Sequence, residues 1–209
     1  MTETVSTRLR RAVLTVALLN LTYFFVEFAV ALGIGSVSLF ADSVDFLEDA
    51  AVNLLIFLAL GWSLRTRAIT GKVLAVIILI PAIAAAWQLI AKAANPEAPD
   101  PLSLVITAGG AAIINLICSL ILARFSKQGG SLVRAAFLTA RNDVIINVLI
   151  ILLGLVTALT MSGWPDIVLG VVIIALNFFA AREVWEKATE EHLESKALQG
   201  EVGCSCGDE

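Results

Sequence analysis

Residues 37–64 read VSLFADSVDFLEDAAVNLLIFLALGWSL. This stretch is predominantly apolar and longer than the roughly 20 residues that an α-helix needs to cross the hydrocarbon core of a bilayer. Four acidic side chains interrupt it, namely Asp42, Asp45, Glu48 and Asp49. An ionised side chain at bilayer depth costs at least about 2.5–3.5 kcal/mol, so these acids need a compensating partner. The stretch therefore predicts a transmembrane helix that carries a polar site.

Five further apolar stretches have comparable length, at residues 12–32, 73–93, 102–123, 132–160 and 167–185. The 209-residue chain is 59% hydrophobic and 15% charged, whereas soluble domains carry about 25% charged residues. This composition excludes a soluble globular domain. We predict an all-α membrane protein, with a six-transmembrane-helix bundle over residues 12–187. A cytoplasmic N-terminus (1–11) precedes the bundle and a flexible cytoplasmic tail (188–209) follows it.

The basic residues predict the orientation of the bundle. Most of the 14 Lys and Arg residues lie before the first apolar stretch, after the second, after the fourth and after the sixth. Basic residues mark the cytoplasmic side of membrane proteins, so both termini are expected in the cytoplasm and the protein in the cell (inner) membrane. The net charge of −4 supplies no basic field, and nucleic acid is excluded as a partner.

Polar residues recur between the first three and the last three spans. The matched pairs are Asn20 with Asn115, Asp49 with Asp143, and Asn53 with Asn147. Three-helix halves that enter the membrane from opposite sides are typical of the inverted repeats of transporters, which bind their substrates near the midplane. The pattern predicts inverted three-helix repeats; chance similarity between apolar helices is the alternative.

Two polar helix faces result from the spacing of these residues. One carries Asp42, Asp45, Asp49 and Asn53, and the other carries Thr139, Asp143 and Asn147. Positions four apart share a helix face, and Asp45, Asp49 and Asp143 can all reach the middle of the bilayer. Carboxylates grouped on one face repel each other unless they are protonated or bind a cation. The pattern favours a divalent cation bound by oxygen ligands; the alternatives are protonated packing groups or ion pairs with Arg141.

Asn147 on the second face is a candidate accessory ligand, and two further groups are as well. Glu27 and Asp42 lie at similar depth on neighbouring spans and are expected to line an outer vestibule, unless they only stabilise helix packing. Cys204 and Cys206 form a Cys-x-Cys pair in the tail, to which His192 could add a nitrogen. Two thiolates can capture a soft or borderline metal ion. An inert tail is the alternative.

Three stretches, residues 19–27, 35–49 and 134–143, resemble the transmembrane domain of the cation diffusion facilitators. The resemblance covers all six spans. It implies export of zinc, cadmium, cobalt, iron or manganese in exchange for protons, usually by a homodimer. It also implies that Asp45 and Asp49 bind the metal together with Asp143, and that the remaining family ligand falls on Thr139.

The sequence departs from the family pattern in two respects. Thr139 offers a neutral hydroxyl where the family commonly has an imidazole or a carboxylate, which moves the expected preference toward harder ions. The family's cytoplasmic metal-binding domain, which helps to hold the dimer, is expected to be missing. A homodimer is therefore a weaker expectation here.

These observations predict a secondary transporter, not an enzyme, with the bilayer, a divalent metal ion and protons as its partners. The metal is the transported substrate, and no prosthetic group is expected. One rival is a metal sensor or accessory membrane protein that binds without transport. The other is a magnesium-dependent membrane transferase, because Asp-rich helix motifs also hold magnesium and a diphosphate.

Overall fold

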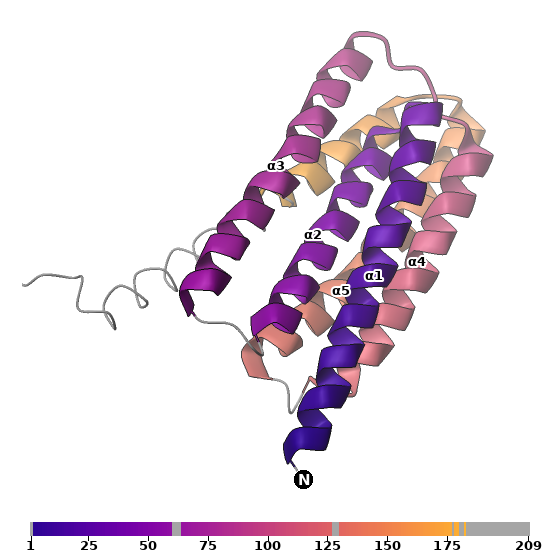
Figure 1. Cartoon of the computed structure of the whole chain (residues 1–209). Helices are drawn as coiled ribbons and strands as arrows, with labels where there is room; N and C mark the ends of the chain where they lie inside the picture. Colours follow the sequence, from indigo (N-terminus) through magenta and orange to yellow (C-terminus); the bar gives the residue numbers. More distant parts are fainter. Residues whose placement is uncertain (1, 60–63, 127–129, 177, 180–181, 183–209) are drawn as a thin grey trace, which may run out of the picture.

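The described part of the protein is entirely helical. The structure is a computed structural model that describes residues 2–59, 64–126, 130–176, 178–179 and 182. Five helices run in chain order (Figure 1): α1 (Thr2–Ile34), α2 (Val37–Ala59), α3 (Leu64–Ala94), α4 (Pro101–Ala123) and α5 (Gly130–Thr160). A shorter apolar helix, Trp164–Leu176, follows α5. The predicted all-α architecture with six helices is confirmed.

The first helix begins earlier than its apolar stretch predicts. α1 starts at Thr2 and continues without a break to Ile34. Residues 2–11 contain neither glycine nor proline, so nothing interrupts the backbone hydrogen bonding where the polar segment meets the apolar one. The predicted tail (188–209) lies outside the described residues.

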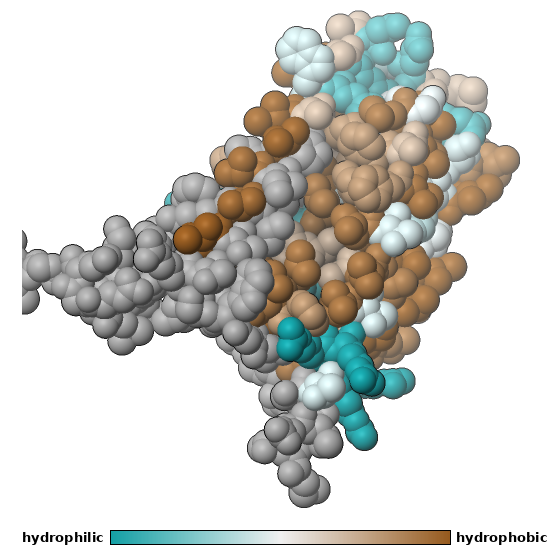
Figure 2. Space-filling model, in the orientation of Figure 1, coloured by the Kyte–Doolittle hydropathy of each residue, from teal (hydrophilic) through white to brown (hydrophobic). Residues whose placement is uncertain are grey.

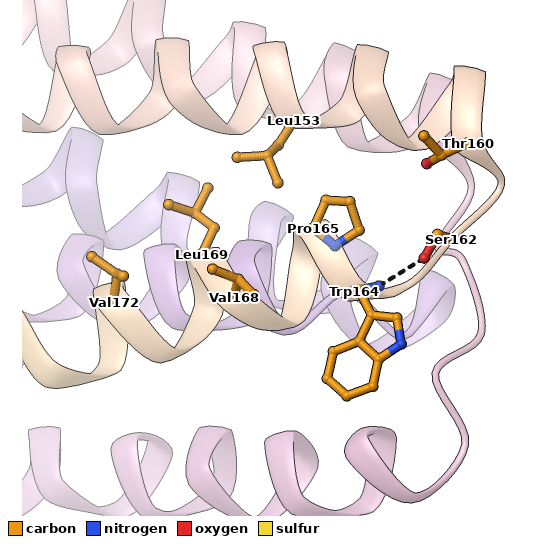
Figure 3. Close-up of a pocket in the computed structure, with 8 residues that line it drawn as sticks. All are labelled: Leu153, Thr160, Ser162, Trp164, Pro165, Val168, Leu169 and Val172. Carbon is orange, nitrogen blue, oxygen red and sulfur yellow. Dashed lines mark hydrogen bonds between the residues drawn. The ribbon is translucent and has the colours of Figure 1, made fainter.

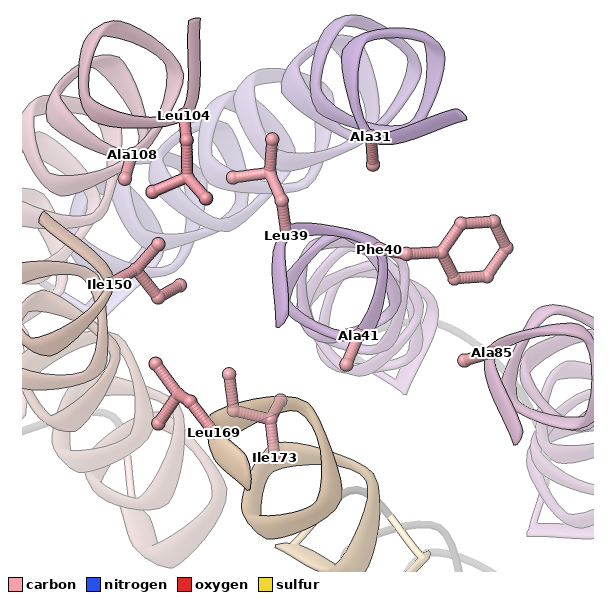
Figure 4. Close-up of a cluster of buried hydrophobic side chains, with 10 residues drawn as sticks. All are labelled: Ala31, Leu39, Phe40, Ala41, Ala85, Leu104, Ala108, Ile150, Leu169 and Ile173. Atoms are coloured by element: carbon pink, nitrogen blue, oxygen red, sulfur yellow. The ribbon is translucent and has the colours of Figure 1, made fainter. Parts of the chain in front are cut away.

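The helices pack around α2. α1 contacts α2 and α4, α4 contacts α5, and α2 contacts both α3 and α5, while α3 lies at the edge of the bundle (Figure 1). The largest core cluster draws apolar side chains from all six helices (Figure 4). Leu39 and Ala41 of α2 lie in it, together with Ile150 of α5 and Ile173 of the last helix. The helix that carries the acids is thus the central one.

The face of the protein drawn in Figure 2 is apolar along the bundle and polar at its ends. Figure 2 shows brown, hydrophobic side chains over the middle of the molecule and hydrophilic ones at both ends. Three helices are long and apolar enough to cross a membrane: Thr7–Ile34, Pro101–Ala123 and Val133–Thr160. α2 has 23 residues, which is long enough, but it carries four acids. Since a helix pairs its own backbone groups, such helices can lie in lipid.

Local sequence explains the sharp connection between α1 and α2. Gly35 adopts a φ of +64°, the left-handed conformation that ends many helices and that glycine tolerates without strain. The Ser36 amide donates to the Ala31 carbonyl at 3.1 Å. The Ser36 hydroxyl then accepts the Leu39 amide at 3.1 Å and caps the start of α2.

An aspartate from a distant segment also caps α2. The buried Asp166 carboxylate, in the first turn of the helix Trp164–Leu176, accepts the Val37 amide at 2.8 Å and the Ser36 hydroxyl at 2.6 Å. It accepts the amide and hydroxyl of Ser38 as well. Lys92, near the end of α3, donates to the same carboxylate at 2.8 Å and to the Gly35 carbonyl. We call this group the Asp166 clamp; it fixes one end of α2 against two other helices.

Candidate metal site

The predicted carboxylates lie on two helices that pack together. Asp45 and Asp49 occupy α2, Asp143 occupies α5, and these two helices are in contact. Asp49 and Asp143 are buried, whereas Asp45 is half-buried. The carboxyl group of Asp143 interacts electrostatically with those of Asp45 and Asp49. The fold therefore brings together three acids that the sequence separates by almost a hundred residues.

The acids adjoin without converging on one point. Among the described residues, no group of three His, Cys, Asp or Glu side chains lies close enough together to hold a metal ion. The carboxylates therefore line a common polar zone between α2 and α5. A cation would have to draw their oxygens inward to bind all three.

A hydrogen-bonded chain from two other helices supports Asp49. The Asn20 amide of α1 donates to the Asp49 carboxylate at 3.4 Å. The thiol of Cys118, buried on α4, donates to the Asn20 side-chain oxygen at 3.5 Å. Asn20 and Cys118 thus position Asp49, a role that single-span patterns did not reveal. The signal available in the sequence was the recurrence of polar residues in otherwise apolar helices.

An asparagine follows one turn after each of two site aspartates. Asn53 donates to the Asp49 backbone carbonyl at 2.9 Å, and Asn147 donates to the Asp143 carbonyl at 2.8 Å. Both asparagines are buried, and the side-chain oxygen of each has no hydrogen-bond partner. The two matched halves of the predicted site therefore have the same local geometry.

The structure leaves Thr139 apart from the buried acids. Its side chain is exposed on α5, and its hydroxyl donates to the Ala135 carbonyl of the same helix at 3.3 Å. Arg141 is exposed as well. Neither residue joins the carboxylates in this conformation; Thr139 shares a helix face with Asp143 by periodicity, but that face is buried at Asp143 and Asn147 and exposed one turn earlier, at Thr139.

Glu27 and Asp42 do not line an open vestibule. Their side chains are 0% and 1% exposed, and their carboxyl groups adjoin between α1 and α2. Neither Glu27 oxygen has ordinary hydrogen-bond geometry with any partner. The expected vestibule is wrong for this conformation, since aromatic packing of Phe24 and Phe28 along α1 closes the bundle there.

Two other features lie away from these acids. Cys204, Cys206 and His192 are outside the described residues. A cavity of about 430 Å³ lies between α5 and the last helix (Figure 3) and is lined mainly by apolar side chains such as Leu153, Trp164 and Val168. It contains none of the predicted ligands.

Sequence reasoning missed the Asp166 clamp. Asp166 lies directly before the last apolar stretch, 167–185, and sequence reasoning assigned it no contact, yet it is 1% exposed and binds the start of α2. An acid directly after Trp164-Pro165 at the start of an apolar helix was the available signal.

Carboxylates enclosed within a bundle of lipid-compatible helices are typical of ion and proton pathways in membrane proteins. The sequence matches the cation efflux transmembrane domain family over residues 13–191, and the chain belongs to this family. Its members are metal-cation transporters and not enzymes, so the magnesium-dependent transferase is ruled out. A search of curated proteins returns no match.

Proposed function

We propose that this protein exports a divalent metal cation, of the zinc, cadmium, cobalt, iron or manganese class, in exchange for protons. Asp45, Asp49 and Asp143 bind the cation. The observation that supports this most directly is the meeting of acids from two packed helices inside an apolar bundle. Thr139 is exposed, and no contact with the three acids supports it as a ligand.

The chemistry of exchange follows from the burial of these acids. Carboxylates held close together in a low dielectric repel each other, and either a divalent cation or protons relieve the repulsion. The two occupants compete for the same oxygens, because metal binding requires deprotonated ligands. Release of the metal is therefore linked to uptake of protons, and the reverse. This linkage is the basis of antiport.

The topology of the proposal follows the charge pattern. The termini face the cytoplasm in the cell (inner) membrane, and the Asp166 clamp lies at the exterior end of α2. The two three-helix halves form inverted repeats, and the unit of transport is a homodimer. Accessory roles in metal handling fall to Glu27 and Asp42 inside the bundle and to Cys204 and Cys206 in the tail.

Metal flux into proteoliposomes under an imposed pH gradient tests the function. The purified full chain should move a divalent cation across the bilayer, and collapse of the pH gradient should abolish accumulation. Asp49→Ala should lose the flux, whereas Asp100→Asn, an exposed change at the N-cap of α4 and away from the acids, should retain it. Wild-type flux in Asp49→Ala would overturn the site. Metal binding to the protein without any flux would favour the sensor or accessory protein.

A further inference from the structure

Two amide oxygens of the site lack a partner. The side-chain oxygens of Asn53 and Asn147 are buried without a hydrogen bond, in side chains that are 1% and 0% exposed. Buried amide oxygens are ordinarily satisfied, and an exception calls for an explanation such as an unobserved ion. Four buried amide oxygens of the described residues lack a partner, and those of Asn53 and Asn147 each lie one turn after an aspartate of the candidate site, whereas those of Gln88 and Asn115 do not.

Helix geometry directs both amides toward the carboxylates. Side chains on an α-helix lean toward its N-terminus, so Asn53 leans toward Asp49 and Asn147 leans toward Asp143. The bonds from their amide nitrogens to the carbonyls of these aspartates hold the two asparagines in that position. α2 and α5 run in opposite directions (Figure 1). The amide oxygens therefore approach the carboxylates from opposite ends of the polar zone.

Two other donors near the site, the soft Cys118 thiol and the Thr139 hydroxyl, are directed elsewhere. Cys118, the only cysteine in the described part of the chain, donates its thiol hydrogen to Asn20. Thr139 is exposed and bonds to its own helix. The donors that remain between α2 and α5 are carboxylate and amide oxygens. Such ligands suit hard divalent cations such as Mn²⁺, whereas Zn²⁺ prefers sites with nitrogen or sulfur ligands.

We propose that the side-chain oxygens of Asn53 and Asn147 complete the cation site formed by Asp45, Asp49 and Asp143, and that this all-oxygen site selects a hard divalent cation such as Mn²⁺ over Zn²⁺. The inference rests on the proposed function, because it specifies the ligands and the substrate class of the same site. It goes further by making two neutral amides the determinants of specificity.

Initial rates of Mn²⁺ and Zn²⁺ uptake in proteoliposomes test this assignment. In Asn53→Ala and in Asn147→Ala, the KM for Mn²⁺ should rise about tenfold or more, while the KM for Zn²⁺ should rise less. Thr157→Val is the matched control, because Thr157 is also buried on α5 with an unpartnered side-chain oxygen. It should leave both KM values unchanged. Equal changes for the two metals, or no change, would overturn the proposal.

The aspartate variants separate a ligand from a packing role. Asn53→Asp and Asn147→Asp keep an oxygen of the same reach but remove the amide donor. If the oxygens are ligands, the purified folded variants should bind Mn²⁺ at least as tightly as wild type in equilibrium dialysis at neutral pH. If the amide donors matter instead, both aspartate variants should bind as poorly as the alanine variants, and the proposal fails.

The outcomes also distinguish this inference from the proposed function. Absence of divalent-cation flux in the wild-type protein would reject the transporter and the amide ligands together. Wild-type flux that Asp49→Ala abolishes, combined with an unchanged Mn²⁺ to Zn²⁺ preference in both asparagine-to-alanine variants, would reject only the amide ligands.

Discussion

The Asp166 clamp should be the strongest single polar contribution to the stability of the bundle. Asp166→Ala removes the acceptor for four donors at the start of α2 and leaves the Lys92 ammonium without its carboxylate. The Lys92 side chain is only 9% exposed. Removing one partner of a buried ion pair costs about 3–5 kcal/mol, because the other charge remains buried and uncompensated.

Lys92→Met is the informative comparison. It leaves the Asp166 carboxylate bound to the hydroxyls of Ser36 and Ser38 and to two backbone amides. The loss is then that of two hydrogen bonds, one to the charged carboxylate, about 1.5–3 kcal/mol, and one to the Gly35 carbonyl, about 1 kcal/mol. Asp166→Ala should therefore be the more destabilising variant by about 1 kcal/mol.

Unfolding in mixed micelles by increasing SDS, followed by tryptophan fluorescence, measures these differences. A double variant of Lys92→Met and Asp166→Ala should lose less stability than the sum of the single losses, because the two residues share one contact. The reasoning would be refuted if Asp166→Ala lost less than about 1 kcal/mol, or if Lys92→Met proved the more damaging of the two.

Three further outcomes follow from the structure. Gly170→Ala should destabilise by about 1–3 kcal/mol in the same unfolding assay, because its Cβ would lie 2.5 Å from Val37; Gly109→Ala, with open space at that position, should not. The hydrogen bonds that Asp100 accepts at the start of α4 lower the pKa of its carboxyl group. Its ionised form therefore stabilises the fold above the unfolded-state pKa of about 3.9, and this stability is lost as pH falls through the lower folded-state pKa. Asp100→Asn should remove this part of the pH dependence, so that the variant loses less stability than wild type between neutral and acid pH in unfolding titrations. Cys118→Ser should leave the order of metal preference unchanged in flux assays, since its thiol bonds to another side chain; selective loss of Cd²⁺ transport would instead make the thiolate a ligand.

Sequence patterns predicted the elements well because lipid imposes a simple rule on them. A helix that crosses a bilayer must be apolar over about 20 residues, so length and hydropathy locate it. Element ends were less predictable, as α1 shows by beginning at Thr2. Hydropathy marks where a helix can contact lipid, whereas the helix continues until a residue such as Gly35 ends its hydrogen bonding.

The sequence predicted which acids belong to the candidate site, but it did not predict which of the neighbouring side chains are buried beside them. Asp45, Asp49 and Asp143 stand out because acids are costly in apolar helices. Thr139 shares a face with Asp143 by periodicity, yet it is exposed. Periodicity gives the direction of a side chain around its own helix, and only the position of the neighbouring helix decides whether that direction is buried.

The sequence alone determined that this chain is a membrane protein of six helices with acids inside the bilayer, because hydropathy and charge are properties of single segments. Only the tertiary structure decided which residues those acids contact. It joined Asp49 to Asn20 and Cys118, and it brought Asp166 to the start of α2. These contacts link residues up to 130 positions apart. The physical reason is that such contacts depend on how neighbouring helices pack, which local hydropathy and periodicity do not specify.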